Sequence, residues 1–184
     1  TDPIFKLTIV NHGNTLGFLA RVPVKETISI NKSQILANIK IALGGRGAEE
    51  VFFGKDKITS GASSDFKQAT QYAVNMVGFW GMTNKGMFFM DQNYHGLFSE
   101  DMKNNTYNKA NEILDESYAF VLEFLENHRK LMNSIVYYLL QQETLYKNDI
   151  ENIINGDYQK IGFNSSLQIE RDTLSPLINQ VITW

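Results

Sequence analysis

Residues Thr59–Thr70 read TSGASSDFKQAT, a run that passes from small loop residues directly into a helical pattern. Asp65 stands at this junction. An acidic side chain in the first turn of a helix is stabilised by the helix dipole by about 0.3–1 kcal/mol. The run by itself therefore leaves two interpretations of Asp65 open: a residue that favours the start of the helix, or a ligand whose partners lie elsewhere in the protein.

Helical periodicity continues downstream of Asp65. The sequence predicts a helix that begins at Ser63 or Ser64 and stops near Gly81, because glycine favours helix C-termini. Its predicted apolar stripe consists of Phe66, Ala69, Ala73, Met76, Val77 and Trp80. This stripe should pack one face of the helix against the rest of the core.

The second half of the chain has a longer helical pattern. It starts at Ser99, and we expect a break near Asn127 because a helix of such length is unusual in globular proteins. Residues 143–154, ETLYKNDIENII, predict a turn followed by a short last helix.

Upstream of the opening run, the sequence predicts a helix that starts at Asn31. Gln34 stands three residues later, where it can complete a capping box. The pair Gly44-Gly45 should weaken or end this helix, because glycine is a poor helix former. A second helical stretch is expected to stop near Gly54.

The N-terminal segment has the pattern of a β-hairpin. Two β-prone runs, residues 4–10 and 16–22, flank the polar turn NHGNT. The predicted fold class is therefore mainly α (α+β), a helical domain with a small N-terminal hairpin. Residues 1–155 are expected to form the domain, and residues 156–184 to form a tail or accessory segment.

Composition excludes several classes of function. The chain has 184 residues, enough for one sizeable core, and a net charge of -3, which argues against nucleic-acid binding. It contains no cysteine, so disulfides, thiol catalysis and cysteine-ligated zinc are excluded. The chain starts with Thr1 and shows no signal peptide. We expect it to be a soluble piece of a longer protein, with any membrane anchor in an upstream part.

Four ordered segments carry a family resemblance. They are DPIFKLTIVNHGNTLGF, ALGGRGAEEVFFG, TSGASSDFKQATQYAVNMVGFWGM and ANEILDESY with the later LLQQETLYKNDIENII. Together, over residues 2–154, they make the chain resemble the peptidase domain of the FtsH-type membrane-anchored AAA metalloproteases. The LGGR-x-AEE-x-x-FG pattern followed by TSGASSD is the most specific part of the resemblance.

The resemblance implies a zinc endopeptidase. In this family an HExxH helix supplies two histidine ligands and a glutamate base, and the third zinc ligand is an acid that corresponds to Asp65. Histidines at i and i+4 lie on one helix face, and a carboxylate from another helix leaves the fourth position open for water. Zinc lowers the pKa of this water and polarises the scissile carbonyl, while the glutamate acts as the general base.

The chain departs from the family in one important respect, because it contains no HExxH. Its histidines, His12, His95 and His128, are far apart and none begins the motif. We expect the motif to lie upstream of residue 1, so that this chain alone neither binds zinc tightly nor cleaves peptides. A smaller departure is Gly47, where the family usually has alanine; it adds backbone freedom worth about 1 kcal/mol.

Other polar residues have simpler interpretations. Ser63 and Ser64 are interpreted as helix caps, since no G-x-S-x-G elbow is present. The GGRG run, residues 44–47, lacks the Lys-Ser/Thr ending of a phosphate loop and indicates close helix packing instead. Glu49 and Glu50 are interpreted as surface or salt-bridge partners on a helix.

The second run of the hairpin suggests a substrate-binding edge. An exposed edge strand can hold an extended polypeptide by backbone hydrogen bonds, with little dependence on sequence. The residues assigned to this edge are Leu16, Gly17, Phe18 and Leu19. An ordinary hairpin strand is the alternative.

By resemblance, the parent protein is expected to be a hexameric, ATP-dependent zinc protease that degrades unfolded or membrane proteins. Its ATPase module would lie outside this chain. The parent would be in a bacterial inner membrane or in the membrane of an organelle such as a mitochondrion or plastid. A non-catalytic paralogue that serves as a scaffold in a mixed ring is the alternative, and retention of Asp65 argues against it.

Overall fold

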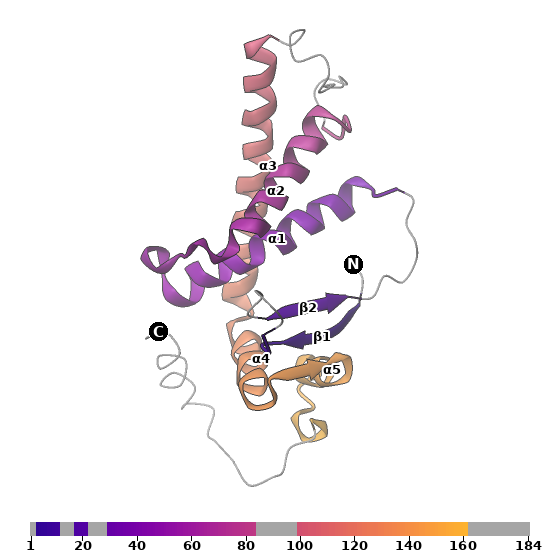
Figure 1. The fold of residues 1–184 in the computed structure, drawn as a ribbon, viewed down its shortest axis with the longest axis vertical. Coiled ribbons are helices and arrows are strands. Elements are labelled where there is room, and N and C mark those ends of the chain that lie inside the picture. The colour runs from indigo at the N-terminus through magenta and orange to yellow at the C-terminus, as the bar shows by residue number, and fades with distance from the viewer. Residues whose placement is uncertain (1–2, 12–16, 22–28, 84–98, 162–184) are drawn as a thin grey trace. The chain divides into compact units, whose positions relative to one another are not determined.

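The computed structural model describes residues 3–11, 17–21, 29–83 and 99–161 (Figure 1). The chain divides into two units, which are described separately below. Unit 1 contains Thr27–Asn127. Unit 2 combines two segments that are distant in sequence, Asp2–Glu26 and His128–Trp184.

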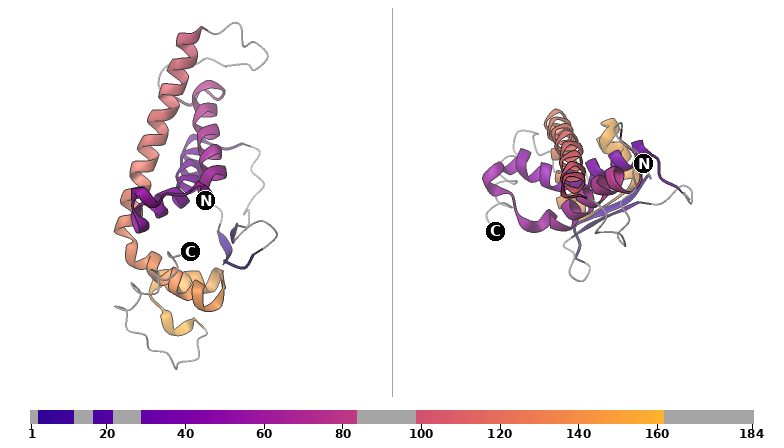
Figure 2. Two further views of the ribbon diagram at one scale, coloured as in Figure 1. Left: turned by 60° about the vertical axis from the view of Figure 1, so that its left-hand side comes forward. Right: turned by 90° about the horizontal axis from the view of Figure 1, so that it is seen from above.

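Unit 1 is a three-helix arrangement. Its helices are α1 (Lys32–Phe53), α2 (Ser63–Gly78) and α3 (Glu100–Asn127), and each contacts the other two. Two short 3-10 helices, η1 (Lys55–Lys57) and η2 (Ser60–Ala62), connect α1 to α2. Figure 1 shows α1 crossing α3 obliquely, with α2 beside α3. Figure 2 shows the same unit from two further directions.

The core of unit 1 is formed by side chains at helical spacing on all three helices. The buried positions are Ile35, Ile39, Ala42, Leu43 and Gly47 of α1, Ala69, Ala73, Met76 and Val77 of α2, and Ala110, Leu114, Ser117, Val121 and Leu125 of α3. Burying a large aliphatic side chain stabilises the fold by about 1.5–3 kcal/mol. Packing of these stripes therefore provides most of the stability of the unit.

The predicted stripe of α2 is largely confirmed. Its four central members are buried, whereas Phe66 and Trp80 remain 48% and 43% exposed. Trp80 lies beyond the last helical residue, Gly78, so it leaves the face that packs against α1 and α3. Nothing in the described part of the chain explains the exposure of Phe66.

Both ends of α1 are as predicted. The Asn31 side chain accepts a hydrogen bond from the Gln34 amide at 3.0 Å, and the Gln34 side chain accepts one from the Asn31 amide at 3.0 Å. This is the expected capping box. The helix ends at Gly54, whose φ of 90° is readily adopted only by glycine.

The expectation of a second, separate helical stretch after Gly44-Gly45 is wrong, because α1 is continuous through the pair. The weakening expected at the pair stays a prediction. Packing explains the continuity: Leu43 and Gly47, on either side, are both buried in the helical core. A Cβ added to Gly47 would lie 2.7 Å from Val121 Cγ1 and 3.3 Å from Leu125 Cδ1. Gly47 thus permits the close approach of α1 and α3, and the prediction of close helix packing is confirmed there.

Unit 2 contains a small antiparallel sheet. Its strands are β1 (Ile4–Thr8), β2 (Phe18–Arg21) and β3 (Thr144–Tyr146), in the order β2-β1-β3. The predicted pairing of the two N-terminal runs is confirmed, with Leu7 opposite Leu19. The third strand was predicted as part of a turn, and this is wrong: three residues are too few to show the alternation that indicates a strand.

Helices α4 (Arg129–Gln142) and α5 (Lys147–Asn155) complete unit 2, followed by the 3-10 helix η4 (Tyr158–Lys160). The predicted helix break is confirmed, because α3 ends at Asn127 and α4 begins two residues later. The predicted short last helix is α5. The buried core of this unit consists of Leu145, Ile150, Ile153 and Ile161.

The fold class is therefore mainly α with a small antiparallel sheet, as predicted. The assignment of residues 1–155 to a domain and of residues 156–184 to a tail stays a prediction. Residues 162–184 lie outside the described residues, and Ile161 packs into the core of unit 2. Among the described helices, none combines the length and apolar character that crossing a bilayer requires.

Candidate metal centre

Asp65 is the third residue of α2, in the first turn of the helix. The helix begins at Ser63, as predicted, and the side chain of Asp65 is exposed. Within the described residues, no hydrogen-bond donor or cation occupies the Asp65 carboxylate. The carboxylate is therefore accessible to a metal ion. It lies at the N-terminal end of the helix, where the helix dipole favours negative charge.

Ser63 does not have the predicted capping role. The N-cap position is Ala62, and no side-chain hydrogen bond caps the helix there. The Ser63 hydroxyl instead donates a hydrogen bond to the carbonyl oxygen of Ser60. Because Ser60 is the first residue of η2, this bond closes the 3-10 turn that leads into the helix.

Glu49 and Thr59 connect α1 to the segment before Asp65. The Thr59 amide donates to Glu49 Oε2 at 2.9 Å, and the Thr59 hydroxyl donates to Glu49 Oε1 at 2.6 Å. The same hydroxyl oxygen accepts a hydrogen bond from the Gly61 amide at 3.1 Å, which caps η2. The Thr59 side-chain and backbone bonds hold the pKa of Glu49 below its usual value, with the nearby charge of Arg46 contributing less.

The role of Glu49 was missed by the sequence interpretation, which treated it as a surface or ion-pair residue. Its partners stand 10 positions further along the chain, beyond the end of α1. The only signal in the sequence is that an acid in the last turns of a helix precedes a Thr-Ser-Gly turn. Such a signal is too general to assign a partner.

Glu50 has a different partner. Tyr118 of α3 donates its hydroxyl to Glu50 Oε2 at 2.6 Å, and Lys55 lies 3.6 Å from Glu50 Oε1, which confirms the predicted salt-bridge role. Burial, followed by the hydrogen bond and the charge of Glu50, raises the pKa of Tyr118 to about 12. This contact fixes the last turns of α1 against α3.

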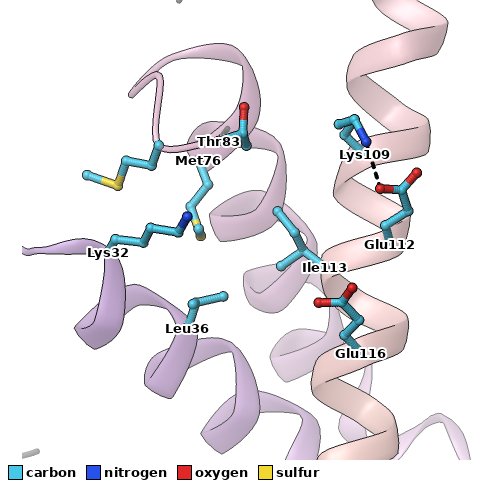
Figure 3. Close-up of a pocket in the computed structure, with 9 residues that line it drawn as sticks. Lys32, Leu36, Met76, Thr83, Lys109, Glu112, Ile113 and Glu116 are labelled. Carbon is cyan, nitrogen blue, oxygen red and sulfur yellow. Dashed lines mark hydrogen bonds and ion pairs between the residues drawn. The ribbon is translucent and has the colours of Figure 1, made fainter. Parts of the chain in front are cut away.

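Two of the surface depressions in the described part of the chain lie on unit 1. One, of about 600 Å³, surrounds Asp65 along the outer face of α2 and is lined by Ser64, Asp65, Lys67, Gln68, Gln71, Tyr72 and Asn75. The other, of about 400 Å³, lies where α1, α2 and α3 converge, and Figure 3 shows its apolar floor of Leu36, Met76 and Ile113. Its rim carries the Lys109–Glu112 ion pair, with an N–O distance of 2.8 Å (Figure 3). Asp65 belongs to the first depression alone.

Asp65 fits one position of a zinc site, because an accessible carboxylate oxygen is an ordinary zinc ligand. Among the described residues, no cluster of three or more histidine, cysteine, aspartate or glutamate side chains could hold a metal. His12 and His95 lie outside the described residues. His128 is exposed at the start of α4, in unit 2.

The predicted substrate edge falls on β2. This strand occupies one edge of the described sheet, and Leu19 is 44% exposed. Phe18 is half-buried, with the Lys6 ammonium 5.0 Å from its ring centroid. A Cβ added to Gly17 would lie 2.6 Å from the Thr8 carbonyl oxygen, so the chain passes close to β1 there. Leu16 lies outside the described residues.

Comparison with known proteins identifies the family to which this chain belongs. The family model of peptidase family M41 matches residues 1–153. The chain therefore belongs to peptidase family M41, the FtsH-type peptidase domain.

Individual relatives agree with this assignment. The chain is 33% identical over 186 residues to an ATP-dependent zinc metalloprotease FtsH of Neorickettsia risticii. It is 40% identical over 160 residues to the ATP-dependent zinc metalloprotease YME1L of Drosophila melanogaster. It is 36% identical over 171 residues to the chloroplastic/mitochondrial FTSH 11 of Arabidopsis thaliana.

The alignments cover most of this chain but a minor part of each relative. They include 95%, 84% and 92% of the chain, and 29%, 22% and 21% of the Neorickettsia, Drosophila and Arabidopsis proteins. The chain thus spans less than a third of the length of these relatives. Their names describe ATP-dependent zinc metalloproteases, and this activity belongs to proteins several times longer.

Proposed function

We propose that this chain is the peptidase module of an ATP-dependent zinc metalloendopeptidase and that Asp65 is one of its zinc ligands. Membership in peptidase family M41 supports the class of reaction. The exposed carboxylate at the start of α2 supports the assignment of Asp65. This accessible acid, within a TSGASSD segment held by hydrogen bonds, is the observation that carries the proposal.

The remaining groups of the centre are proposed to come from an HExxH helix outside these 184 residues. Two histidines and Asp65 would hold the ion, which supplies an activated water and polarises the peptide carbonyl. The contribution of this chain is to hold a negative ligand oxygen at a fixed helix end. The charge of Asp65 also offsets part of the positive charge at the centre.

The whole protein is proposed to act as a hexameric, membrane-anchored machine on unfolded or membrane proteins. ATP would be hydrolysed by a separate module, and the energy used to deliver an extended chain to the peptidase. Relatives that are named ATP-dependent and several times longer than this chain support a division into modules.

The ligand assignment is tested by replacing Asp65 with asparagine or alanine in the full-length protein. We expect both variants to lose proteolysis and bound zinc, because the centre loses one of its ligands. ATP hydrolysis should continue, because it is proposed to take place in a separate module. Asp56→Asn, a change of another exposed acid in η1, serves as the matched control. Proteolysis that persists in Asp65→Asn with normal zinc content would disprove the assignment.

We further propose that β2 binds the substrate by adding an extended chain to the sheet edge. Consecutive N–H groups of a strand point to opposite sides, so one of Phe18 and Leu19 directs its N–H away from β1. Proline removes this donor. We expect one of Phe18→Pro and Leu19→Pro, in the full-length protein, to fold normally and degrade casein slowly.

Alanine at the same two positions is the control, because it shortens the side chain and keeps the N–H group. The alanine variants should degrade casein faster than the proline variant. Unchanged casein degradation by both proline variants, with normal folding and zinc content, would argue against the edge-strand role while leaving the zinc assignment intact.

A further inference from the structure

We propose that Glu49 is a positioning residue of the candidate metal centre, and that it orients Asp65 by anchoring Thr59. The inference rests on the proposed function, since it assumes that Asp65 binds zinc. It goes beyond the proposed function by assigning a role to two residues that have no ligand atom in the centre.

The anchor is made by one carboxylate that binds two donors of one residue. Glu49 Oε2 accepts from the Thr59 amide at 2.9 Å, and Glu49 Oε1 accepts from the Thr59 hydroxyl at 2.6 Å. A two-point contact of this kind fixes both the position and the orientation of Thr59, whereas a single bond would allow rotation.

Short hydrogen-bonded steps continue from Thr59 to the start of α2. Thr59 Oγ1 accepts from the Gly61 amide at 3.1 Å, and the Ser63 hydroxyl donates to the Ser60 carbonyl. Asp65 follows two residues later. Each step spans two or three residues, so a shift of Thr59 would reach the first turn of the helix.

Apolar packing of this segment is only partial, since Ile58 and Ala62 are half-buried. Neither η1 nor η2 contains a buried residue, and Thr59, Ser60 and Gly61 are exposed. The two Glu49 hydrogen bonds are therefore a specific restraint on an exposed part of the loop between the helices. A Cβ added to Gly61 would lie 3.2 Å from Thr59 Oγ1, so a larger residue there would crowd the anchor.

Glu49 itself stands on a well-fixed part of α1. Gly47, two residues before it, is buried against Val121 and Leu125 of α3. Glu50, one residue after it, accepts the Tyr118 hydroxyl at 2.6 Å. The position of Glu49 is thus set by the packing of α1 on α3, and Glu49 transmits this position to the segment that carries Asp65.

Groups that act on a metal through its ligands are known to tune affinity, and their loss typically weakens metal binding by 10- to 100-fold. Since Glu49 acts through an intervening turn, we expect the lower end of this range. Glu49→Ala in the full-length protein should weaken zinc binding by about 10-fold. Thr59→Val removes the hydroxyl bonds to Glu49 and Gly61 and keeps the amide bond to Glu49, so it should also weaken zinc binding. Thr59→Ser keeps all three bonds and should retain wild-type affinity.

Two further measurements separate positioning from general stability. In the 184-residue chain, Glu49→Ala should speed hydrogen exchange at the Thr59 and Gly61 amides and leave the core amides of α1 and α3 unchanged. In an Asp65→Ala background, Glu49→Ala should still speed exchange at the Thr59 amide, because the anchor does not depend on Asp65. Glu123→Ala, at an exposed position of α3, is the control and should change neither exchange nor zinc affinity.

The outcomes distinguish this inference from the proposed function. If Asp65→Ala leaves zinc affinity unchanged, the proposed function fails and the inference fails with it. If Asp65→Ala abolishes zinc binding while Glu49→Ala speeds exchange at Thr59 and leaves zinc affinity at the wild-type value, the positioning role alone is overturned. A loss of zinc affinity in Glu49→Ala without faster exchange at the Thr59 and Gly61 amides would overturn it as well.

Discussion

Gly47 of α1 packs directly against Val121 of α3, so closely that a Cβ on Gly47 would lie 2.7 Å from Val121 Cγ1. Glycine normally costs a helix interior about 1 kcal/mol relative to alanine. Here the missing side chain allows two helices to approach. The last turns of α1 also contact α3 through the hydrogen bond from Tyr118 to Glu50. In these turns, Glu49 binds Thr59 of the segment that precedes Asp65.

We predict that Gly47→Ala destabilises the chain by about 1–3 kcal/mol, because overpacking outweighs the gain in helix propensity. Gly44→Ala is the matched control: a Cβ added there would have no atom within 4 Å, so it should stabilise by up to about 1 kcal/mol. Urea unfolding measures both. Adding Val121→Ala to Gly47→Ala should reduce the clash, and strictly additive effects of the two changes would contradict the close contact.

Stability should depend on pH through Glu49. The pKa of Glu49 is lower in the folded chain than in the unfolded chain, chiefly because of the hydrogen bonds from Thr59. The ionised Glu49 carboxylate therefore stabilises the folded state at pH values above the unfolded pKa. This stabilisation is lost as the pH falls below the ordinary value of 4.5 and through the folded pKa. The free energy of unfolding of wild type should therefore fall more steeply with acid than that of Glu49→Gln. Parallel curves for the two proteins below about pH 5 would count against the anchor.

Tyr118 should lose its phenolic proton at a higher pH than an ordinary tyrosine. Its folded pKa of about 12 exceeds the ordinary value of 10.0, so the protonated phenol stabilises the fold up to the unfolded pKa and loses this effect as the pH rises to about 12. Tyr118→Phe should destabilise by about 1–3 kcal/mol, because it leaves the Glu50 carboxylate without this donor. Tyr107→Phe is the control, since Tyr107 is 58% exposed on the same helix.

The tyrosinate absorbance of the folded chain measures this directly. Tyr118→Phe should remove the highest-pH component of the titration, whereas Tyr107→Phe should leave that component in place. If the highest-pH component persists in Tyr118→Phe, the Tyr118–Glu50 bond does not have the assigned effect.

Two adjacent isoleucines of α5 provide a test of the core of unit 2. Ile153 is 1% exposed and Ile154 is 56% exposed, so the same substitution probes two environments. Ile153→Ala should destabilise by about 2–5 kcal/mol, because it removes buried methyl groups and leaves a cavity. Ile154→Ala should change the free energy of unfolding by no more than about 0.5 kcal/mol. Equal effects in thermal unfolding would show that α5 does not bury Ile153 in this core.

Several features of this chain could be predicted because their causes are local. Asn31 and Gln34 form their capping box within one helical turn, and Gly54 ends α1 through its own backbone freedom. The break after Asn127 follows from the length of the helical pattern. The place of Asp65 in the first turn of α2 follows from the small residues before it and the apolar period after it.

Other features depend on residues that are distant in sequence. The strand β3 exists because Thr144 pairs with Thr8, 136 positions away, and three residues alone do not indicate a strand. The continuity of α1 through Gly44-Gly45 depends on burial against α2 and α3, which outweighs a weak local preference.

The sequence by itself determined most of the helical segments, the outer ends of α1, the family resemblance and the acid at the head of α2. Only the tertiary structure decided which side chains restrain that acid: Glu49 reaches Thr59 across a helix end, and Gly47 lets α1 approach α3. The physical reason is the range of the interactions. Caps and apolar periodicity act within a few residues, whereas hydrogen bonds and close packing between separate elements exist only once those elements have been brought together.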